Sequence, residues 1–189
     1  MSATATRRYT YDDLRETPDD GLRYEIIDGE LIVSAAPTRW HQEIQQLLNR
    51  WFDRASGYGQ LGKLFSAPVD IKFATDNVVE PDLLFIRRSR LGIYRHEGFM
   101  EAPPDIVVEI VSPSSRDRDL DEKLALYAAQ GVPEYWVADY VGPTLRLFVL
   151  SEGTYQEIAP TGGRLRSLVL PDLVIVFADL FDDLQDLIS

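Results

Sequence analysis

Asp105-Ile-Val-Val-Glu-Ile-Val-Ser112 is the stretch that decides the fold. Side chains alternate along a strand, so Glu109 shares one face with the other odd-numbered residues. Both faces are otherwise largely apolar, which is typical of a central strand covered on both sides. A carboxylate buried there without a partner is costly, so Glu109 needs a cation, a hydrogen-bond network or a metal. The alternative is that Glu109 lies at the strand end, where it pairs with an arginine or faces solvent.

A second acidic residue stands in the preceding apolar segment, which predicts a strand over residues 79–86. Pro81 cannot donate a hydrogen bond to a sheet, so Glu80-Pro81-Asp82 marks a strand entrance or a bulge. Such a position often presents a ligand, and Asp82 is the candidate. Alternatively, Asp82 accepts hydrogen bonds from local backbone amides. Alternation leaves open whether Glu80 or Asp82 points inward.

The segment after Ser112 predicts a helix over residues 115–130, with Gly131 just past its end. Lys123 falls on the apolar side of this helix, because one stripe of helical spacing contains it. That stripe comprises Arg116, Leu120, Lys123, Leu124 and Tyr127. A helix packed on the strand of Glu109 brings the Lys123 ammonium towards that carboxylate. The alternative is a surface ion pair between Lys123 and Asp119, four residues earlier.

The remaining pattern is that of an α/β domain with a mixed sheet. Asp28-Gly29 predicts a type I′ turn in a hairpin over residues 24–33. Helical spacing predicts a helix from Pro37-Thr38 to about Ala55. Further strands are expected at 61–66, 68–73 and 134–139, in a hairpin of 145–150 and 155–158, and near Val174, before an acidic helix-like tail. We expect a single domain over residues 1–189, with its core at 9–181.

Composition indicates an ordinary globular protein of 189 residues with 45% hydrophobic and 26% charged residues. The absence of cysteine excludes disulfides, thiolate zinc sites and cysteine nucleophiles. No signal peptide or membrane span is recognisable, so we expect a cytoplasmic protein. The net charge of −12 is concentrated at the ends, since residues 12–30 hold eight acids and residues 171–189 hold five.

A local basic segment offsets this charge in the middle of the chain. Residues 87–96 carry one histidine and no acid, with arginines at Arg87, Arg88, Arg90 and Arg95. These arginines could contact a DNA backbone, which positions a substrate without reading its sequence. The alternative is that these arginines form an ordinary solvated loop.

Other chemistries find no support in the sequence. It contains no phosphate-binding glycine loop, no Gly-x-Ser-x-Gly elbow, and only two histidines, far apart in the chain. Oxygen ligands beside a lysine favour Mg²⁺ or Mn²⁺. Glu25, inside an apolar strand, and His41, in the first turn of a helix, are structural candidates when each is considered alone.

Taken together, these motifs resemble the Uma-two family of restriction-endonuclease-like proteins, across roughly residues 9–181. The motifs are Tyr24-Glu-Ile-Ile-Asp-Gly-Glu, Pro37-x-x-x-His41, Glu80-Pro-Asp82-Leu, Pro104-Asp-Ile-Val-Val-Glu109-Ile-Val-Ser-Pro-Ser, Asp119-x-x-x-Lys123-x-x-x-Tyr127 and Gly131-Val-Pro-Glu-Tyr-Trp-Val-Ala-Asp139. The resemblance implies the PD-(D/E)xK nuclease fold, a mixed β-sheet flanked by helices. To this core we add an N-terminal and a C-terminal β-hairpin.

The resemblance also implies roles for individual residues. Asp82 matches the first motif carboxylate and Glu109 the second, while Val111 stands where the motif places a lysine. Lys123 would then be a lysine that has migrated to the helix. Asp82, Glu109 and the backbone carbonyl of Ile110 would bind Mg²⁺ or Mn²⁺. Glu25 and His41 match recurrent positions of the family, so catalytic roles are expected for both.

The function expected from this resemblance is metal-dependent hydrolysis of phosphodiester bonds in DNA. We also expect a homodimer, since two sites conveniently make two strand cuts. Two alternatives stay open. One is a catalytically silent nucleic-acid-binding or regulatory module on the same fold, favoured by the acidic composition and by Val111 in place of the motif lysine. The other is a phosphodiesterase acting on RNA or a small nucleotide.

Overall fold

Strand β8, Ile106–Val111, is buried along its whole length and forms the centre of the molecule. The computed structural model describes residues 7–94, 98–112 and 115–181. The alternation expected for β8 is confirmed, because Ile106, Val108 and Ile110 belong to one apolar cluster. Val107 and Val111 belong to another cluster on the opposite face. Glu109 therefore points into the same layer as Val107 and Val111.

The main sheet has six strands in the order β11-β10-β9-β8-β6-β3. Strand β8 pairs in parallel with β9 and antiparallel with β6, so the sheet is mixed as expected. A β-hairpin of β10 and β11 extends the sheet beyond β9. The bounds are β3 Gly62–Ser66, β6 Leu83–Arg87, β9 Glu134–Asp139, β10 Thr144–Ser151 and β11 Thr154–Glu157.

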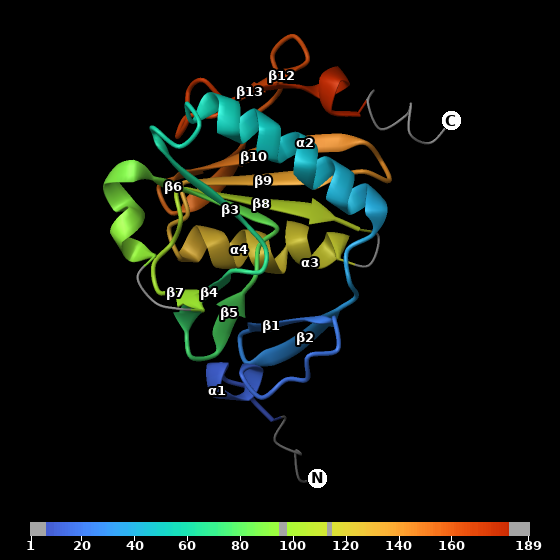
Figure 1. Ribbon diagram of the computed structural model, residues 1–189, viewed down its shortest axis with the longest axis vertical. Helices are drawn as coiled ribbons and strands as arrows, with labels where there is room; N and C mark the ends of the chain where they lie inside the picture. The colour runs from blue at the N-terminus through green and yellow to red at the C-terminus, as the bar shows by residue number, and fades with distance from the viewer. Residues whose placement is uncertain (1–6, 95–97, 113–114, 182–189) are drawn as a thin grey trace.

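Helix α2, Arg39–Ala55, covers one face of this sheet (Figure 1). Thr38 caps it by accepting a hydrogen bond from the His41 backbone N–H, as the sequence predicts. Its apolar stripe contributes Ile44, Leu47, Leu48 and Phe52 to the core beneath. A small hairpin of β12, Arg164–Arg166, and β13, Val174–Val176, extends this layer, and residues 177–181 are helical. Residues 182–189 of the expected acidic tail lie outside the described residues.

Two short helices and a second sheet cover the other face (Figure 1). The helices are α3, Arg116–Leu120, and α4, Glu122–Ala129. The second sheet has the order β2-β1-β5-β4-β7. Its strands are β1 Arg23–Ile27, β2 Glu30–Ser34, β4 Asp70–Ala74, β5 Asn77–Val79 and β7 Phe99–Met100, and the short helices α1 Tyr11–Leu14 and η1 Arg88–Ile93 complete the fold.

Two expected elements are each divided in the structure. The strand expected at 79–86 is wrong as one element, since β5 ends at Val79 in the second sheet and β6 begins at Leu83 in the main sheet. The chain changes sheets at Glu80-Pro81-Asp82, where the proline cannot continue a ladder. The helix expected at 115–130 is broken at Asp121, whose ψ of −69° with φ of −118° separates α3 from α4.

The break at Asp121 also corrects the expected stripe of this helix. Arg116, which the expected stripe includes, is exposed and pairs with Asp139. Asp119, which the expected stripe does not include, is buried. Lys123 and Tyr127, both in α4, are buried as expected.

Both predicted hairpin turns are confirmed. Asp28 and Gly29 have φ of 49° and 77°, and Glu152 and Gly153 have φ of 50° and 80°. Two successive positive φ values are the signature of the type I′ turn, which Asp-Gly tolerates well. In the part of the chain that the structure describes, no helix combines the length and the apolar character needed to cross a membrane.

Candidate functional site

A cavity of about 390 Å³ lies between the two sheets, where five segments of the chain converge. Strand β1, helix α2, the β5–β6 junction, strand β8 and the α3–α4 pair each contribute charged or polar side chains. Among the residues that line it are Glu25, His41, Asp82, Glu109, Ile110 and Lys123, all expected from the sequence to form the site. The fold therefore brings together in one cavity every expected site residue outside the arginine segment.

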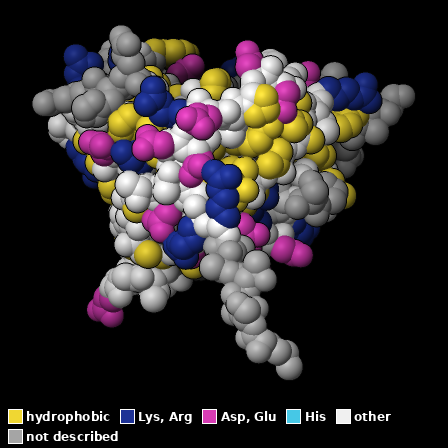
Figure 2. Space-filling view, turned by 90° about the horizontal axis from the view of Figure 1, so that it is seen from below, with side chains coloured by type: hydrophobic (Ala, Val, Ile, Leu, Met, Phe, Trp, Pro, Cys, Tyr) yellow, Lys and Arg dark blue, Asp and Glu magenta, His cyan; other side chains and the backbone are white. Residues whose placement is uncertain are grey.

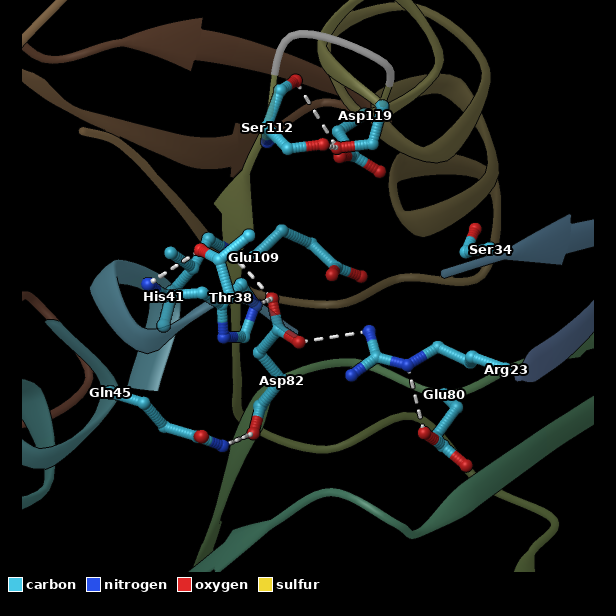
Figure 3. Close-up of polar contacts among 12 residues, drawn as sticks. Arg23, Ser34, Thr38, His41, Gln45, Glu80, Asp82, Glu109, Ser112 and Asp119 are labelled. Atoms are coloured by element: carbon cyan, nitrogen blue, oxygen red, sulfur yellow. Dashed lines mark hydrogen bonds and ion pairs between the residues drawn. The ribbon is translucent and has the colours of Figure 1, made fainter. Parts of the chain in front are cut away.

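Asp82 reaches this cavity because the chain leaves one sheet for the other at this residue. Its Oδ2 accepts a hydrogen bond from the Ile110 backbone N–H at 2.7 Å and lies 3.0 Å from His41 Nε2. Its Oδ1 lies 2.8 Å from Arg23 Nη1 (Figure 3). Asp82 is 1% exposed, so the alternative of a purely local amide contact does not describe it. Its partners come from β1, α2 and β8.

Glu109 is likewise held by residues distant in sequence. Its Oε1 accepts hydrogen bonds from Lys123 Nζ at 2.9 Å and from the Tyr127 hydroxyl at 2.8 Å. Glu109 is 2% exposed and Lys123 is 1% exposed, which excludes both a solvent-facing glutamate and a surface lysine. Asp119 Oδ1 is 3.7 Å from Lys123 Nζ, but this pair is also buried. The lysine expected to reach Glu109 from the helix does so.

Glu25 supports the lysine from the side of the second sheet. Its Oε1 lies 2.8 Å from Lys123 Nζ and accepts a hydrogen bond from the Glu80 backbone N–H at 2.9 Å. Glu25 thus links strand β1, the β5–β6 junction and helix α4 through one carboxylate oxygen. The position of the ammonium is fixed by carboxylates on two sides.

Arg23 is a site residue that the sequence analysis missed. Its Nη1 pairs with Asp82 and its Nε lies 2.9 Å from Glu80 Oε1 (Figure 3). This geometry also answers which acid points inward: Asp82 and Glu80 both approach the arginine from the β5–β6 junction. No local pattern marks Arg23, because it opens a strand whose first residues are only half-buried.

Burial and neighbouring charge shift the ionisation of these groups in opposite directions. Burial would raise the pKa of Asp82, but the hydrogen bond from His41 and the charge of Arg23 lower it to about 2. Burial raises the pKa of Glu109 to about 8, although Lys123 acts in the opposite sense. Burial opposes the charged form of Lys123, yet Glu109, Glu25 and Asp119 outweigh it and raise the lysine pKa. Lys123 is therefore a cation at neutral pH.

The donor set can be compared with the needs of Mg²⁺. Within the described ranges, no group of three or more histidine and acidic side chains is arranged to enclose a metal. Mg²⁺, however, is commonly held by one or two carboxylates, with water and substrate phosphate completing its shell. Asp82 Oδ1 is buried and accepts no hydrogen bond, since its contact with Arg23 is an ion pair without hydrogen-bond geometry. Asp82 and Glu109 line the same cavity, and their carboxylate oxygens are donors of the kind that Mg²⁺ takes.

The arginine segment is not brought to this cavity. Arg90 Nη1 lies 2.9 Å from Asp105 Oδ1, and Arg87 donates to the carbonyl of Val169. Arg88 contacts the carbonyl of Gly59. None of these three lines the cavity, and Arg95 lies outside the described residues. Their DNA contacts stay a prediction from sequence.

The face of the molecule that carries the second sheet has both acidic and basic side chains. Figure 2, which shows the side of the second sheet, has acidic and basic side chains interspersed rather than a continuous basic area. On this face, there is no obvious electrostatic track for a nucleic acid.

Comparisons with known proteins agree with the fold. A family model described as "Uma2: Putative restriction endonuclease" matches residues 10–178. A solved structure titled as a putative nuclease of DUF820 from Anabaena variabilis superposes with a TM-score of 0.75 at 19% sequence identity. The superposition covers 92% of this chain and 97% of that one. No curated protein matches this chain.

Proposed function

Because the chain belongs to the Uma2 family, whose model spans residues 10–178, we propose that it is a metal-dependent endonuclease that hydrolyses phosphodiester bonds in DNA. The observation that carries the proposal is the convergence of Asp82, Glu109 and Lys123 in one cavity. Two carboxylates and an ammonium in a water-accessible cavity suit hydrolysis of an anionic ester, because the chemistry requires charge neutralisation and a positioned water.

Asp82, Glu109 and the carbonyl of Ile110 would hold one Mg²⁺ or Mn²⁺. When bound, the ion supplies Lewis-acid polarisation of the phosphate and lowers the pKa of a bound water. Asp82 is suited to this task because its low pKa keeps it a carboxylate at neutral pH. His41 is best assigned as a positioning residue, since its Nε2 meets Asp82 Oδ2 at 3.0 Å and so fixes the orientation of that carboxylate.

Lys123 would act as a fixed cation rather than as a general base, because its raised pKa keeps it protonated. From its position beside Glu109, the Lys123 ammonium can donate a hydrogen bond to the attacking water or to a phosphate oxygen as negative charge develops. Glu25 holds the ammonium in place from the opposite side. Val111 in β8 is then no obstacle to catalysis, because the lysine of the motif is supplied by α4.

The direct test is cleavage of single-stranded, duplex and branched DNA by the purified protein with Mg²⁺ or Mn²⁺, and with EDTA as control. Metal-dependent cleavage that is lost in Lys123→Ala supports the proposal. No cleavage of any of these substrates would exclude the DNA endonuclease function, and equal cleavage by Lys123→Ala would exclude the role of the migrated lysine. Parallel assays with RNA and with a small nucleotide phosphodiester identify the substrate class.

A second candidate function is a catalytically silent module that binds nucleic acid or regulates a partner. It is favoured by one observation: the site charges already neutralise one another, since Arg23 pairs with Asp82 and Lys123 pairs with Glu25 and Glu109. Calorimetric titration with Mn²⁺ separates the two candidates when combined with the cleavage assay. Metal bound through Asp82 without hydrolysis supports the silent module.

We also propose a homodimer for the endonuclease, because two sites cut two strands of a duplex most simply. The molar mass in solution, measured by light scattering with and without duplex DNA, tests this assembly. A monomer in both conditions would refute it.

A further inference from the structure

Besides Arg23 and Lys123, the cavity is lined by a third basic side chain that is charged at neutral pH and that forms no ion pair with a carboxylate of the described residues. Arg23, His41 and Lys123 each lie within 3.0 Å of a carboxylate oxygen. Arg118, from helix α3, also lines the cavity. In the part of the chain that the structure describes, no carboxylate forms an ion pair with it. Arg118 is therefore the cavity cation that remains available to an external anion.

The hydrogen bonds of Arg118 lead to the same conclusion. Its Nη2 donates to Ser34 Oγ at 3.2 Å, and its Nε is buried without a hydrogen-bond partner. A guanidinium has five N–H donors in a planar fork that matches the oxygens of a phosphate. A contact with one neutral hydroxyl leaves most of this capacity unused. Ser34 holds the side chain at the cavity wall without consuming its charge.

The acidic residues that line the cavity explain why an incoming phosphate requires a cation with no carboxylate partner. Glu25, Asp82, Glu109 and Asp119 line the same cavity, and they repel an incoming phosphate. Arg23 and Lys123 are committed to these carboxylates. Arg118 lies next to Asp119 in the chain and faces Ser34 of β2, so it occupies the side of the cavity opposite helix α2. Hydroxyl groups of Thr38 and Tyr140, 3.3 Å apart, line the cavity on the α2 side.

We propose that Arg118 is the substrate-phosphate ligand of this cavity and binds non-bridging oxygens of a backbone phosphodiester beside Asp82 and Glu109. The inference rests on the proposed nuclease function, and it adds the residue that recognises the anionic group of the substrate. Phosphate bound by an arginine fork is held in a defined orientation, which a point charge does not provide. Arg118 contacts the backbone and reads no base, so its contribution is independent of sequence.

The test measures DNA binding separately from cleavage. A short fluorescein-labelled single strand and its duplex are titrated with the full-length protein by fluorescence anisotropy, in Ca²⁺ and over a range of salt concentrations. We expect Arg118→Gln to weaken binding by roughly 10- to 100-fold. The slope of log affinity against log salt should fall by about one, as for the loss of one phosphate contact. Arg118→Lys should retain the slope while binding more weakly than the parent.

Two control variants separate this role from a structural one. Arg116→Gln removes a neighbouring arginine of the same helix that pairs with Asp139, and it should leave affinity and salt slope unchanged. Ser34→Ala removes the hydroxyl that holds Arg118 but not the charge, so its salt slope should equal that of the parent. Calorimetry should give the same Mn²⁺ affinity for Arg118→Gln as for the parent, which shows that the metal site is intact.

The outcomes distinguish this inference from the proposed function. If the parent binds and cuts DNA but Arg118→Gln binds with the same affinity and salt slope, Arg118 is not the phosphate ligand and the nuclease function stands. If the parent neither binds nor cuts any DNA tested, both are overturned. A loss of affinity equal in Arg118→Gln and Arg116→Gln also overturns the inference, because it would reflect general charge.

Discussion

Lys123 Nζ lies 2.9 Å from Glu109 Oε1, although the two residues are 14 positions apart in the chain. Glu109 belongs to strand β8 and Lys123 to helix α4. Both side chains are almost fully buried, so the pair forms without competition from water. Glu25 and Asp119 also approach this ammonium, at 2.8 and 3.7 Å. Lys123 is thus a positive charge that three buried carboxylates share.

Lys123→Met keeps an unbranched side chain, one heavy atom shorter, and removes its charge. It leaves the buried carboxylates uncompensated, so we expect the free energy of unfolding to fall by about 3–5 kcal/mol. The cleavage rate should fall by roughly 100-fold or more, as for the loss of a transition-state donor. Thermal unfolding and a cleavage time course at a temperature where the variant is folded measure the two effects. Lys63→Met, at an exposed position, is the control and should change neither.

Asp82→Asn tests the carboxylate at the junction of the two sheets. The amide retains the shape but cannot supply an anionic oxygen, so Mn²⁺ binding measured by calorimetry should be lost or weakened by at least tenfold, which corresponds to about 1.4 kcal/mol. Asp105→Asn is the matched control, because Asp105 is equally buried but bound to Arg90 outside the cavity. Undiminished Mn²⁺ binding by Asp82→Asn would contradict the assigned ligand.

Tyr127→Phe removes the second hydrogen bond to Glu109 Oε1. A hydrogen bond to a charged group contributes about 1.5–3 kcal/mol, whereas one between neutral groups contributes about 0.5–1.5 kcal/mol. The tyrosine of strand β11, Tyr155, provides the comparison, because its hydroxyl donates to the neutral carbonyl of Val132 at 2.9 Å. Burial raises the pKa of Glu109 to about 8, so this carboxylate is charged only above that pH. Chemical denaturation at about pH 9 should therefore show a larger loss of stability for Tyr127→Phe than for Tyr155→Phe. The reverse order would mean that Glu109 does not carry charge in the folded protein.

The raised pKa of Asp70, in β4 next to the site, predicts that the stability of the protein depends on pH. Burial raises its pKa to about 7, with further contributions from Glu80 and Glu25. The unfolded carboxyl titrates near pH 4, so the folded state binds the proton more tightly and loses stability as the pH rises from about 4 to about 7. Asp70→Asn should remove this loss, and its melting temperature should exceed that of the parent at pH 8 but not at pH 4.

Asp76→Asn should shift the melting temperature at pH 8 in the opposite direction. The hydrogen bond from Arg8 lowers the pKa of Asp76, so its carboxylate stabilises the folded state above the unfolded pKa. The variant should melt below the parent at pH 8. If Asp70→Asn also melts below the parent at pH 8, the ionisation assigned to Asp70 is wrong.

The sequence was sufficient to find the residues whose position follows from local periodicity. Glu109 is conspicuous because it interrupts an apolar run, and Lys123 because it falls within a helical stripe. Pro81 indicated that the chain is irregular before Asp82, but not that it leaves one sheet for another there. That change of sheet depends on contacts of β5 with β1 and of β6 with β8, which no local pattern records.

Residues that act across the two sheets could not be predicted in the same way. Arg23, Asp119 and Arg118 each meet their partners through tertiary contacts between segments far apart in the chain. An unbroken helix predicts Asp119 only as a surface partner of Lys123. In the structure the helix is interrupted at Asp121, Asp119 is buried and Arg116 is exposed, and the interruption is visible only in the backbone angles.

We propose that Asp82 and Glu109 hold a divalent cation beside Lys123. A crystal soaked in Mn²⁺ can show this ion, because the metal is located by its anomalous scattering. We predict a peak bonded to both carboxylates, with Arg23 no longer paired with Asp82 Oδ1. A structure at saturating Mn²⁺ with no peak between these carboxylates, and with Arg23 still paired with Asp82, would contradict the account.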